Sequence, residues 1–328
     1  MEKLRFATIG TNFIVERFLE ASLNIDEIKL SAVYSRSIDN ARKLLKDSEA
    51  VKIYTDLNEL ATAEDIDFVY IASPTSLHME HSIKMLEAGK HVICEKPMAS
   101  NSREYYYMKE AARKNNVVLF EAMRPLYHPS WKIIQEGMNR IGRIHKARLS
   151  FCKYSSRYDN FKRGIIENAF RPELSNGAVM DIGIYCIEAM LSLFGKPQKI
   201  NTHGYVIKNS IDAYGVIIAS YENMICCLDY SKITNSETPC EIQGEDATLY
   251  FDKIACPSKV WINKTNGEEE VLFHKEIYGD MKYEIHAFIN LIRDNITEET
   301  HEDITESALL LTDQVRADLG IVFPNDVL

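Results

Sequence analysis

The chain has 328 residues, of which 46% are hydrophobic and 26% charged, and this balance excludes a disordered or low-complexity protein. Its length exceeds the size at which a single hydrophobic core usually stops growing, so we expect two domains. The 38 basic and 48 acidic residues leave a net charge of −10, which argues against a nucleic-acid partner and favours a small-molecule function.

The amino-terminal residues Met1–Arg5 lead directly into a strand-like segment, without the apolar stretch of a signal peptide. No uninterrupted apolar run approaches the length of a membrane span, so we expect a cytoplasmic protein with no membrane partner. The seven cysteines are scattered and form no C-x-x-C pair, which is typical of reduced thiols rather than of a disulfide framework or a zinc site. We therefore expect no metal.

The first third of the chain alternates short β-branched or apolar runs with longer segments of helical period. This alternation predicts a parallel sheet covered by helices. The predicted strands are Arg5–Ile9, Lys29–Tyr34, Phe68–Ala72, His91–Cys94 and Val117–Phe120. We place the end of this domain near Ala122.

The turn after the first predicted strand is a candidate binding site for the pyrophosphate of a dinucleotide. Its residues are Gly10, Thr11, Asn12, Phe13 and Ile14. The glycine fingerprint is incomplete, because Asn12 and Val15 stand where the second glycine and the third small residue are usual. Asparagine tolerates positive φ, so we expect Asn12 to adopt the turn. An ordinary strand–helix turn is the alternative.

The end of the second predicted strand indicates which dinucleotide is preferred. A domain that prefers NAD usually carries an acidic residue there, to bind the ribose hydroxyls. This chain instead has Ser35 and Arg36 followed by Ser37. A guanidinium pairs with phosphate through two parallel hydrogen bonds, so the sequence favours NADP(H) over NAD(H). A solvated arginine at a helix start is the alternative.

The second half of the chain has consecutive strand patterns without helices between them, which predicts a large, mainly antiparallel sheet. The predicted strands are Ile144–Lys153, Lys199–Ile207, Tyr214–Ala219, Met224–Ser231, Cys240–Gln243 and Thr248–Phe251. Predicted helices are Asp181–Phe194, apolar nearly all round, and two later ones, Tyr283–Arg293 and Ser307–Leu319. Too few helices are predicted to cover both faces of this sheet, so one face should be open.

Four motifs in order resemble the Gfo/Idh/MocA family of NAD(P)-dependent oxidoreductases. Cys94–Pro97 (C-E-K-P) resembles its Glu-Lys-Pro signature, and Ser73–His78 (S-P-T-S-L-H) resembles its T-P-N-x-x-H turn. Glu121–Pro129 resembles its domain crossover, and Gly177–Tyr185 resembles the G-x-x-x-D-x-G-x-[HY] run of its active-site helix. The resemblance implies an α/β plus α+β protein, with a Rossmann NAD(P)-binding domain at 1–122 and a substrate-binding and oligomerisation domain at 123–328.

The resemblance also implies site residues. Those expected to bind the cofactor, beyond the turns already named, are Ser73, Pro74, His78, Glu95, Lys96 and Arg124. Those expected to be catalytic are Lys96, Tyr185 and Asp181. Tyrosine at the last motif position is similar to glucose-fructose oxidoreductase and dimeric dihydrodiol dehydrogenase, whereas inositol dehydrogenases include members with histidine there.

The chemistry of hydride transfer suits these residue types. A proton has to move to or from the carbinol oxygen in the same step. A lysine ammonium stabilises a tyrosinate, so Lys96 is expected to help Tyr185 transfer this proton, or to bind the substrate oxygen directly. Asp181 precedes Tyr185 by one helical turn, which predicts both side chains on one helix face.

Three other features have more than one interpretation. His78 and His81 have a spacing that could hold a metal, but hydrogen-bonded structural histidines are the expectation. His128 could contact the substrate or form hydrogen bonds within the crossover. The segment Tyr154–Asn176 carries four cationic side chains, so an anionic group on the substrate stays open.

The function predicted from these observations is NAD(P)-dependent oxidoreduction of a secondary alcohol or carbonyl group on a sugar-like or cyclic polyol substrate. A glycosidase of the same fold that uses bound NAD is one alternative, and a dinucleotide-binding regulator without catalysis is another. The open sheet face predicts a homodimer or homotetramer.

Overall fold

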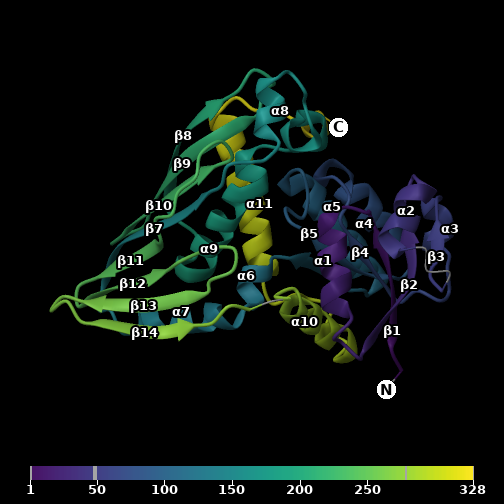
Figure 1. Ribbon diagram of the computed structural model, residues 1–328, viewed down its shortest axis with the longest axis horizontal. Helices are drawn as coiled ribbons and strands as arrows, with labels where there is room; N and C mark the ends of the chain where they lie inside the picture. Colours follow the sequence, from purple (N-terminus) through teal and green to yellow (C-terminus); the bar gives the residue numbers. More distant parts are fainter. Residues whose placement is uncertain (1, 47–49, 278, 328) are drawn as a thin grey trace. The chain divides into compact units, whose positions relative to one another are not determined.

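The computed structural model describes residues 2–46, 50–277 and 279–327 (Figure 1). It divides into two compact units, one formed by Met1–Ala122 with Gly279–Asp303 and the other by Met123–Tyr278 with Ile304–Leu328. A second domain that runs without interruption from 123 to 328 is therefore a wrong prediction, because the segment Gly279–Asp303 packs with the first unit.

The first unit contains a six-stranded parallel sheet with the order β3-β2-β1-β4-β5-β6. Its strands are β1 (Leu4–Ile9), β2 (Ile28–Tyr34), β3 (Lys52–Tyr54), β4 (Phe68–Ile71), β5 (His91–Glu95) and β6 (Leu119–Ala122). Its helices are α1 (Phe13–Ser22), α2 (Ile38–Leu45), α3 (Leu57–Ala61), η1 (Thr75–Leu77), α4 (His78–Glu87), α5 (Ser102–Asn115) and α10 (Lys282–Arg293). The strand order reverses between β1 and β4, and ligands bind at such a switch point in open α/β sheets.

Aromatic packing explains why α10 belongs to the first unit. Phe288 on α10 packs edge-on against Phe68 of β4 and Phe120 of β6, with ring centroids 5.2 and 5.5 Å away. On the sheet itself, Phe6 stacks on Phe68 at 5.2 Å. Phe288 is fully buried, so the last part of this core is supplied by residues far along the chain.

The second unit contains an eight-stranded sheet with the order β14-β13-β12-β11-β7-β10-β9-β8. Its strands are β7 (Ile144–Cys152), β8 (Lys199–Val206), β9 (Asp212–Ser220), β10 (Ile225–Ser231), β11 (Cys240–Gly244), β12 (Ala247–Phe251), β13 (Lys259–Lys264) and β14 (Glu269–His274). The pair β7 and β10 is parallel, and the other neighbouring pairs are antiparallel. The predicted fold class is confirmed.

Helices of the second unit lie on one face of this sheet, as Figure 1 shows for α6, α9 and α11. They are α6 (Arg124–Tyr127), α7 (Pro129–Met138), α8 (Tyr158–Lys162), η2 (Asn168–Phe170), η3 (Pro172–Leu174), η4 (Val179–Gly183), α9 (Ile184–Phe194), α11 (Glu302–Asp318) and η5 (Pro324–Asp326). Along β9, Ala213 and Ile217 are buried, whereas Tyr214 and Val216 are 43% and 38% exposed. The exposed side chains therefore mark the open face of the sheet.

One helical run, Pro172–Phe194, is long and apolar enough to cross a membrane by length and composition alone. However, 78% of its apolar window is buried inside the protein, as in a core helix.

All seven cysteines are free thiols, as predicted. Burial raises the pKa of Cys94 and Cys186 well above the usual thiol value, which is typical of unreactive thiols.

Candidate active site

The carboxyl ends of the parallel strands bring most of the predicted cofactor-binding residues to one edge of the first sheet. Because β1, β2, β4 and β5 run in the same direction, the turns that follow them meet at this edge. The predicted residues on these turns are Gly10, Thr11, Asn12, Phe13, Ile14, Ser35, Arg36, Ser73, Pro74, Glu95 and Lys96.

Gly10 is required by a close approach between the turns after β1 and β4. Its φ is +121°, and a Cβ at this position would lie 2.8 Å from the carbonyl oxygen of Ala72. Its N–H donates to the Tyr34 carbonyl at the end of β2, 3.2 Å away. Only glycine combines this conformation with this approach.

Asn12 is the N-cap of α1, and its φ of −86° is not the positive value that the sequence suggested. Its Oδ1 accepts from the N–H groups of Ile14 and Val15 at 3.0 and 3.3 Å. Its Nδ2 donates to the Ala72 carbonyl at 2.9 Å. The residue at the second glycine position therefore ties the helix start to the turn after β4, and Val15 at the third position is fully buried.

Arg36 lies exposed directly after β2, and no ion pair to it is found within the described ranges. Burial first, and then the charge of Arg36, lower the pKa of His81 to about 4, so the imidazole beside the guanidinium is neutral. His81 Nδ1 lies 3.0 Å from Ser73 Oγ. Ser35 Oγ accepts from the N–H of Ser37, 3.1 Å away. Arg36 therefore supplies an unneutralised positive charge at the edge where the turns meet.

His78 is buried, and its ring connects two of these turns through hydrogen bonds. Its Nδ1 lies 2.9 Å from the Pro97 carbonyl oxygen, and its Nε2 lies 2.9 Å from the Ser73 carbonyl oxygen. Burial lowers its pKa to about 4. This geometry supports a positioning role, while direct contact with a cofactor stays a prediction. Among the described residues, no group of three or more His, Cys, Asp or Glu could hold a metal ion.

The turn that carries Lys96 is anchored on both sides. Before it, Glu95 accepts a 2.7 Å hydrogen bond from the hydroxyl of Tyr70. After it, the N–H of Met98 donates to the buried carboxylate of Glu121, 2.8 Å away. The Lys96–Pro97 peptide bond is cis. Lys96 itself is partly exposed, as a group that contacts a ligand has to be.

In the second unit, the predicted helix 181–194 consists of two parts. Val179–Gly183 forms a π-helical turn, and the α-helix begins at Ile184. Asp181 therefore lies in the wider π-helical turn and Tyr185 in the α-helix, and the placement of both side chains on one helix face stays a prediction. Such π-turns inside helices occur frequently at functional sites.

Asp181 and Tyr185 have different surroundings. Asp181 Oδ2 forms an ion pair with Lys232 Nζ at 2.9 Å. Tyr185 is 8% exposed, and its ring packs edge-on against Phe151 at 5.4 Å. Sequence reasoning missed Lys232, because its partner lies 51 positions earlier (232 − 181) and no local pattern links the two.

At the start of the second unit, Arg124 is the partly buried first residue of α6. His128 is buried and caps α7, with Nδ1 2.6 Å from Ser130 Oγ and 3.3 Å from the Ser130 N–H. Of the two interpretations of His128, the structure supports hydrogen bonding within the crossover.

The cationic side chains of the segment 154–176 are engaged within that segment. Arg157 pairs with Glu167 at 3.6 Å, and Lys162 pairs with Asp159 at 2.6 Å. The remaining two donate hydrogen bonds, Arg163 to Asn160 and Arg171 to the Ile166 carbonyl. Arg157 and Lys162 are thus paired with carboxylates of the same segment, whereas Arg163 and Arg171 bind neutral oxygens.

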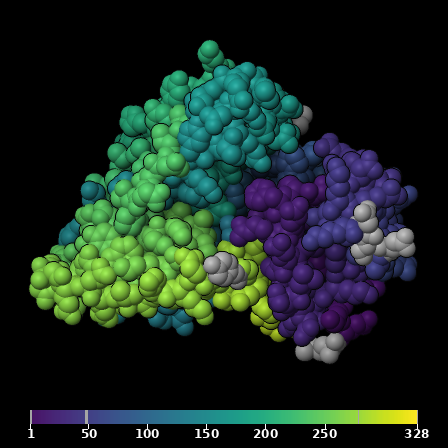
Figure 2. Space-filling model, in the orientation of Figure 1, coloured from purple at the N-terminus to yellow at the C-terminus, as the bar shows by residue number. Residues whose placement is uncertain are grey.

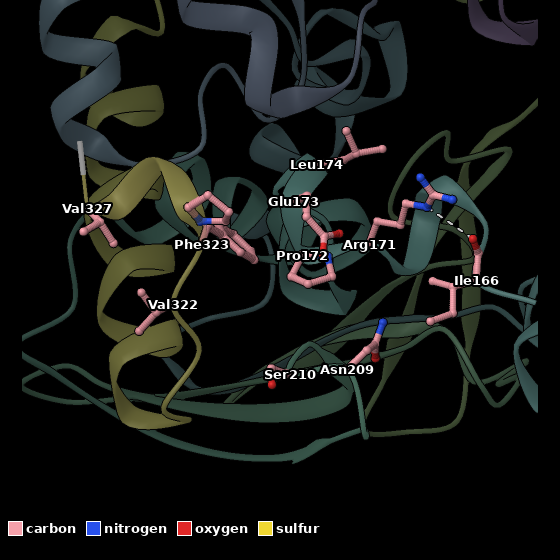
Figure 3. A pocket seen from close by; sticks show the side chains of 11 residues that line it. Ile166, Arg171, Pro172, Glu173, Leu174, Asn209, Ser210, Val322, Phe323 and Val327 are labelled. Atoms are coloured by element: carbon pink, nitrogen blue, oxygen red, sulfur yellow. Dashed lines mark hydrogen bonds between the residues drawn. The ribbon is translucent and has the colours of Figure 1, made fainter. Parts of the chain in front are cut away.

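Arg171 also lines a cavity of about 740 Å³ within the second unit (Figure 3). Figure 3 shows its guanidinium beside Ile166, with Asn209 and Ser210 from the β8–β9 turn across the cavity. Val322, Phe323 and Val327 contribute apolar walls.

Two family models match the chain. The first, an oxidoreductase family with an NAD-binding Rossmann fold, matches residues 4–123. The second, the GFO/IDH/MocA C-terminal domain, matches residues 132–250.

Curated relatives match over nearly the whole chain. The scyllo-inositol 2-dehydrogenase (NADP(+)) IolU of Bacillus subtilis is 42% identical, over 98% of this chain and 99% of its own. The trans-1,2-dihydrobenzene-1,2-diol dehydrogenase of Mus musculus is 26% identical, over 98% of this chain and 99% of its own. Among solved structures, KijD10, a 3-ketoreductase from Actinomadura kijaniata in complex with NADP, shares the fold with a TM-score of 0.81 at 22% identity, over 97% of this chain and 98% of that chain.

Proposed function

This chain belongs to the Gfo/Idh/MocA oxidoreductase family, and on that premise we propose that it is an NADP(H)-dependent dehydrogenase of an uncharged cyclic polyol. The likeness to an NADP-dependent scyllo-inositol dehydrogenase supports both the cofactor and the substrate class. The internal pairing of Arg157 and Lys162 supports a substrate without a phosphate or carboxylate group.

One observation carries the cofactor proposal. The turn after β1 passes so close to the turn after β4 that a Cβ at Gly10 would collide with the Ala72 carbonyl, and an exposed Arg36 follows β2 at the same edge of the sheet. The pyrophosphate fits against the backbone of the first turn, and the guanidinium suits a 2′-phosphate. Residues of the turns after β4 and β5, from Ser73 to Lys96, would complete the site.

A bound nicotinamide would supply or accept the hydride at the carbinol carbon. The chain's own residues handle the proton and the orientation of the substrate. Tyr185 gives or takes the proton at the substrate oxygen, and the ammonium of Lys96 lowers the cost of the phenolate. Asp181 accepts a hydrogen bond from a substrate hydroxyl and so orients the ring. This assignment of roles rests on the family resemblance.

The experiment that tests the function is incubation with NADP+ and a panel of inositols and neutral sugars, followed by cofactor absorbance. Reduction of NADP+ that depends on one polyol is the expected result. Glycoside cleavage without net cofactor change would instead indicate the glycosidase, and cofactor binding without either reaction would indicate a regulator. A cytoplasmic location stays a prediction.

Replacing Arg36 tests the cofactor preference. If Arg36 pairs with the 2′-phosphate, Arg36→Ala should weaken NADPH binding by about 1.5–3 kcal/mol, the scale of a charge-assisted hydrogen bond, and spare NADH. Fluorescence titration of both cofactors measures this. Arg42→Ala, which removes another exposed arginine from α2, is the matched control. An equal loss for both cofactors contradicts the assignment.

The open face of the large sheet supports a homodimer or homotetramer. Tyr205 stacks on Tyr214 at 5.6 Å and Tyr250 on Trp261 at 5.3 Å. Figure 2 shows the light-green side chains of the outer strands at the surface of the second unit.

Light scattering should give a multiple of the 37.6 kDa chain mass, because exposed apolar strands are usually buried by a partner. A monomer at micromolar concentration contradicts this. Val216→Arg should dissociate the assembly.

A further inference from the structure

Lys232 is a charged side chain in the interior of the second unit. It directly follows β10, and its N–H donates to the Ala213 carbonyl of the neighbouring strand, 2.9 Å away. Its side chain is only 3% exposed, although an ammonium is costly to bury unless it is paired and hydrogen-bonded. A position this deep calls for specific partners.

The partners of Lys232 come from two sides. Nζ donates to the Ala169 carbonyl at 2.8 Å and lies 5.1 Å from the centre of the Phe170 ring. On the other side it pairs with Asp181 Oδ2 at 2.9 Å, and the Asp181 side chain is 38% exposed. The pair is asymmetric, because the cation is buried while the carboxylate reaches the surface. Lys232 can therefore act on a ligand only through Asp181.

Asp212 fixes the start of the same π-helical turn. Its two carboxylate oxygens accept from the N–H groups of Ala178 and Val179, at 2.9 and 2.7 Å. Asp212 is buried, and a Cβ at Gly177 would collide with its carboxylate. Burial raises the pKa of Asp212 to about 6, while the charge of Lys232 opposes this rise. Asp212 therefore binds the backbone at the start of the π-helical turn. Lys232 binds the carboxylate of Asp181 within the same turn.

We propose that Lys232 is a positioning residue for the reaction, which orients the carboxylate of Asp181 toward the substrate and links it to the Ala169–Phe170 segment. This inference rests on the proposed function, in which Asp181 binds a substrate hydroxyl. A lysine that only tethers the 169–170 segment through its carbonyl contact would stabilise the fold without affecting turnover. The two roles differ in what they predict for kcat.

The chain offers a matched control for burial. Lys90 is also a buried lysine, with Nζ bound to the carbonyls of Ala63 and Ile66 at 2.6 and 3.1 Å. It directly precedes β5, so it lies at the amino ends of the parallel strands. The candidate site lies at their carboxyl ends. Lys90→Met should therefore lower the melting temperature and leave kcat unchanged.

Steady-state kinetics with the polyol found in the screen give the main test. Lys232→Met should lower kcat by roughly 100-fold, the scale of a misplaced catalytic-site group, with the KM for NADP+ unchanged. Lys232→Arg keeps the charge and should recover part of this loss. In an Asp181→Asn background, Lys232→Met should cause little further loss, because the two residues act as a unit. A kcat for Lys232→Met equal to that of Lys90→Met overturns the proposal.

Thermal unfolding of the same variants gives a readout that does not depend on the substrate. The melting-temperature losses of Lys232→Met and Asp181→Asn should not add in the double variant, since each removes the same ion pair. Additive losses overturn the positioning role even if the enzyme is active. If the wild-type enzyme is inactive on every polyol and the melting-temperature losses are not additive, the proposed function is overturned. The ion pair between Lys232 and Asp181 is then still established.

Discussion

Tyr185→Phe is expected to lower kcat by about two to four orders of magnitude, the usual contribution of general acid–base catalysis. The substitution removes only the hydroxyl, so the ring can keep its edge-on contact with Phe151 and the helix should stay folded. Cofactor affinity should change little, because the hydroxyl that is removed is assigned to the proton of the substrate and not to cofactor binding. Steady-state oxidation of NADPH with the carbonyl product of the identified polyol measures the effect.

Tyr221→Phe is the matched control for this substitution. The Tyr221 hydroxyl donates to the Gly195 carbonyl at 2.8 Å, directly after the helix that carries Tyr185. Its removal should cost about 1 kcal/mol of stability and leave turnover unchanged. Near wild-type turnover in Tyr185→Phe would mean that another group moves the proton, and the assignment of Tyr185 would be withdrawn.

On the proposed roles, Lys96→Met should reduce kcat to a similar extent, because the ammonium assigned to stabilise the phenolate is lost. The double variant with Tyr185→Phe should be little slower than either single variant, since residues that act as a unit are not additive. The measurement is again kcat at saturating substrate, with NADPH affinity measured separately by titration.

Lys84→Met serves as the control for Lys96, because its Nζ binds the Asn58 side chain at a partly exposed position of α4. It should leave kcat unchanged. Multiplicative losses in the double variant would show that Lys96 and Tyr185 act in separate steps, and a loss confined to NADPH affinity would make Lys96 a cofactor-binding residue only.

The strands that were predicted correctly are those with strong local signals. β1, β4 and β5 are buried apolar runs, which a parallel sheet covered on both faces requires. The three-residue strand β3 is too short to show a pattern, and β13 and β14 lie beyond the last alternating run that was assigned. Pattern length therefore explains why β3 was missed, but it does not explain β13 and β14, which have six residues each.

The details of the candidate site depended on contacts that no local pattern encodes. Asn12 was expected at positive φ because it occupies a glycine position, yet its side chain caps α1 and binds the turn after β4 instead. The π-turn at Val179–Gly183 continues directly into the apolar α-helix that begins at Ile184, so periodicity could not separate the two. The Asp181–Lys232 pair joins a helix to a strand end.

The return of α10 to the first unit has a consequence for protein engineering. A cassette cut after Ala122 would leave Phe68 and Phe120 without the ring of Phe288, and the backbone of Glu121 without the carboxylate of Glu299 that binds it at 3.2 Å. The nucleotide module is thus encoded in two separate stretches of the gene. A chimera that exchanges cofactor specificity between relatives has to transplant residues 279–303 together with the first 122.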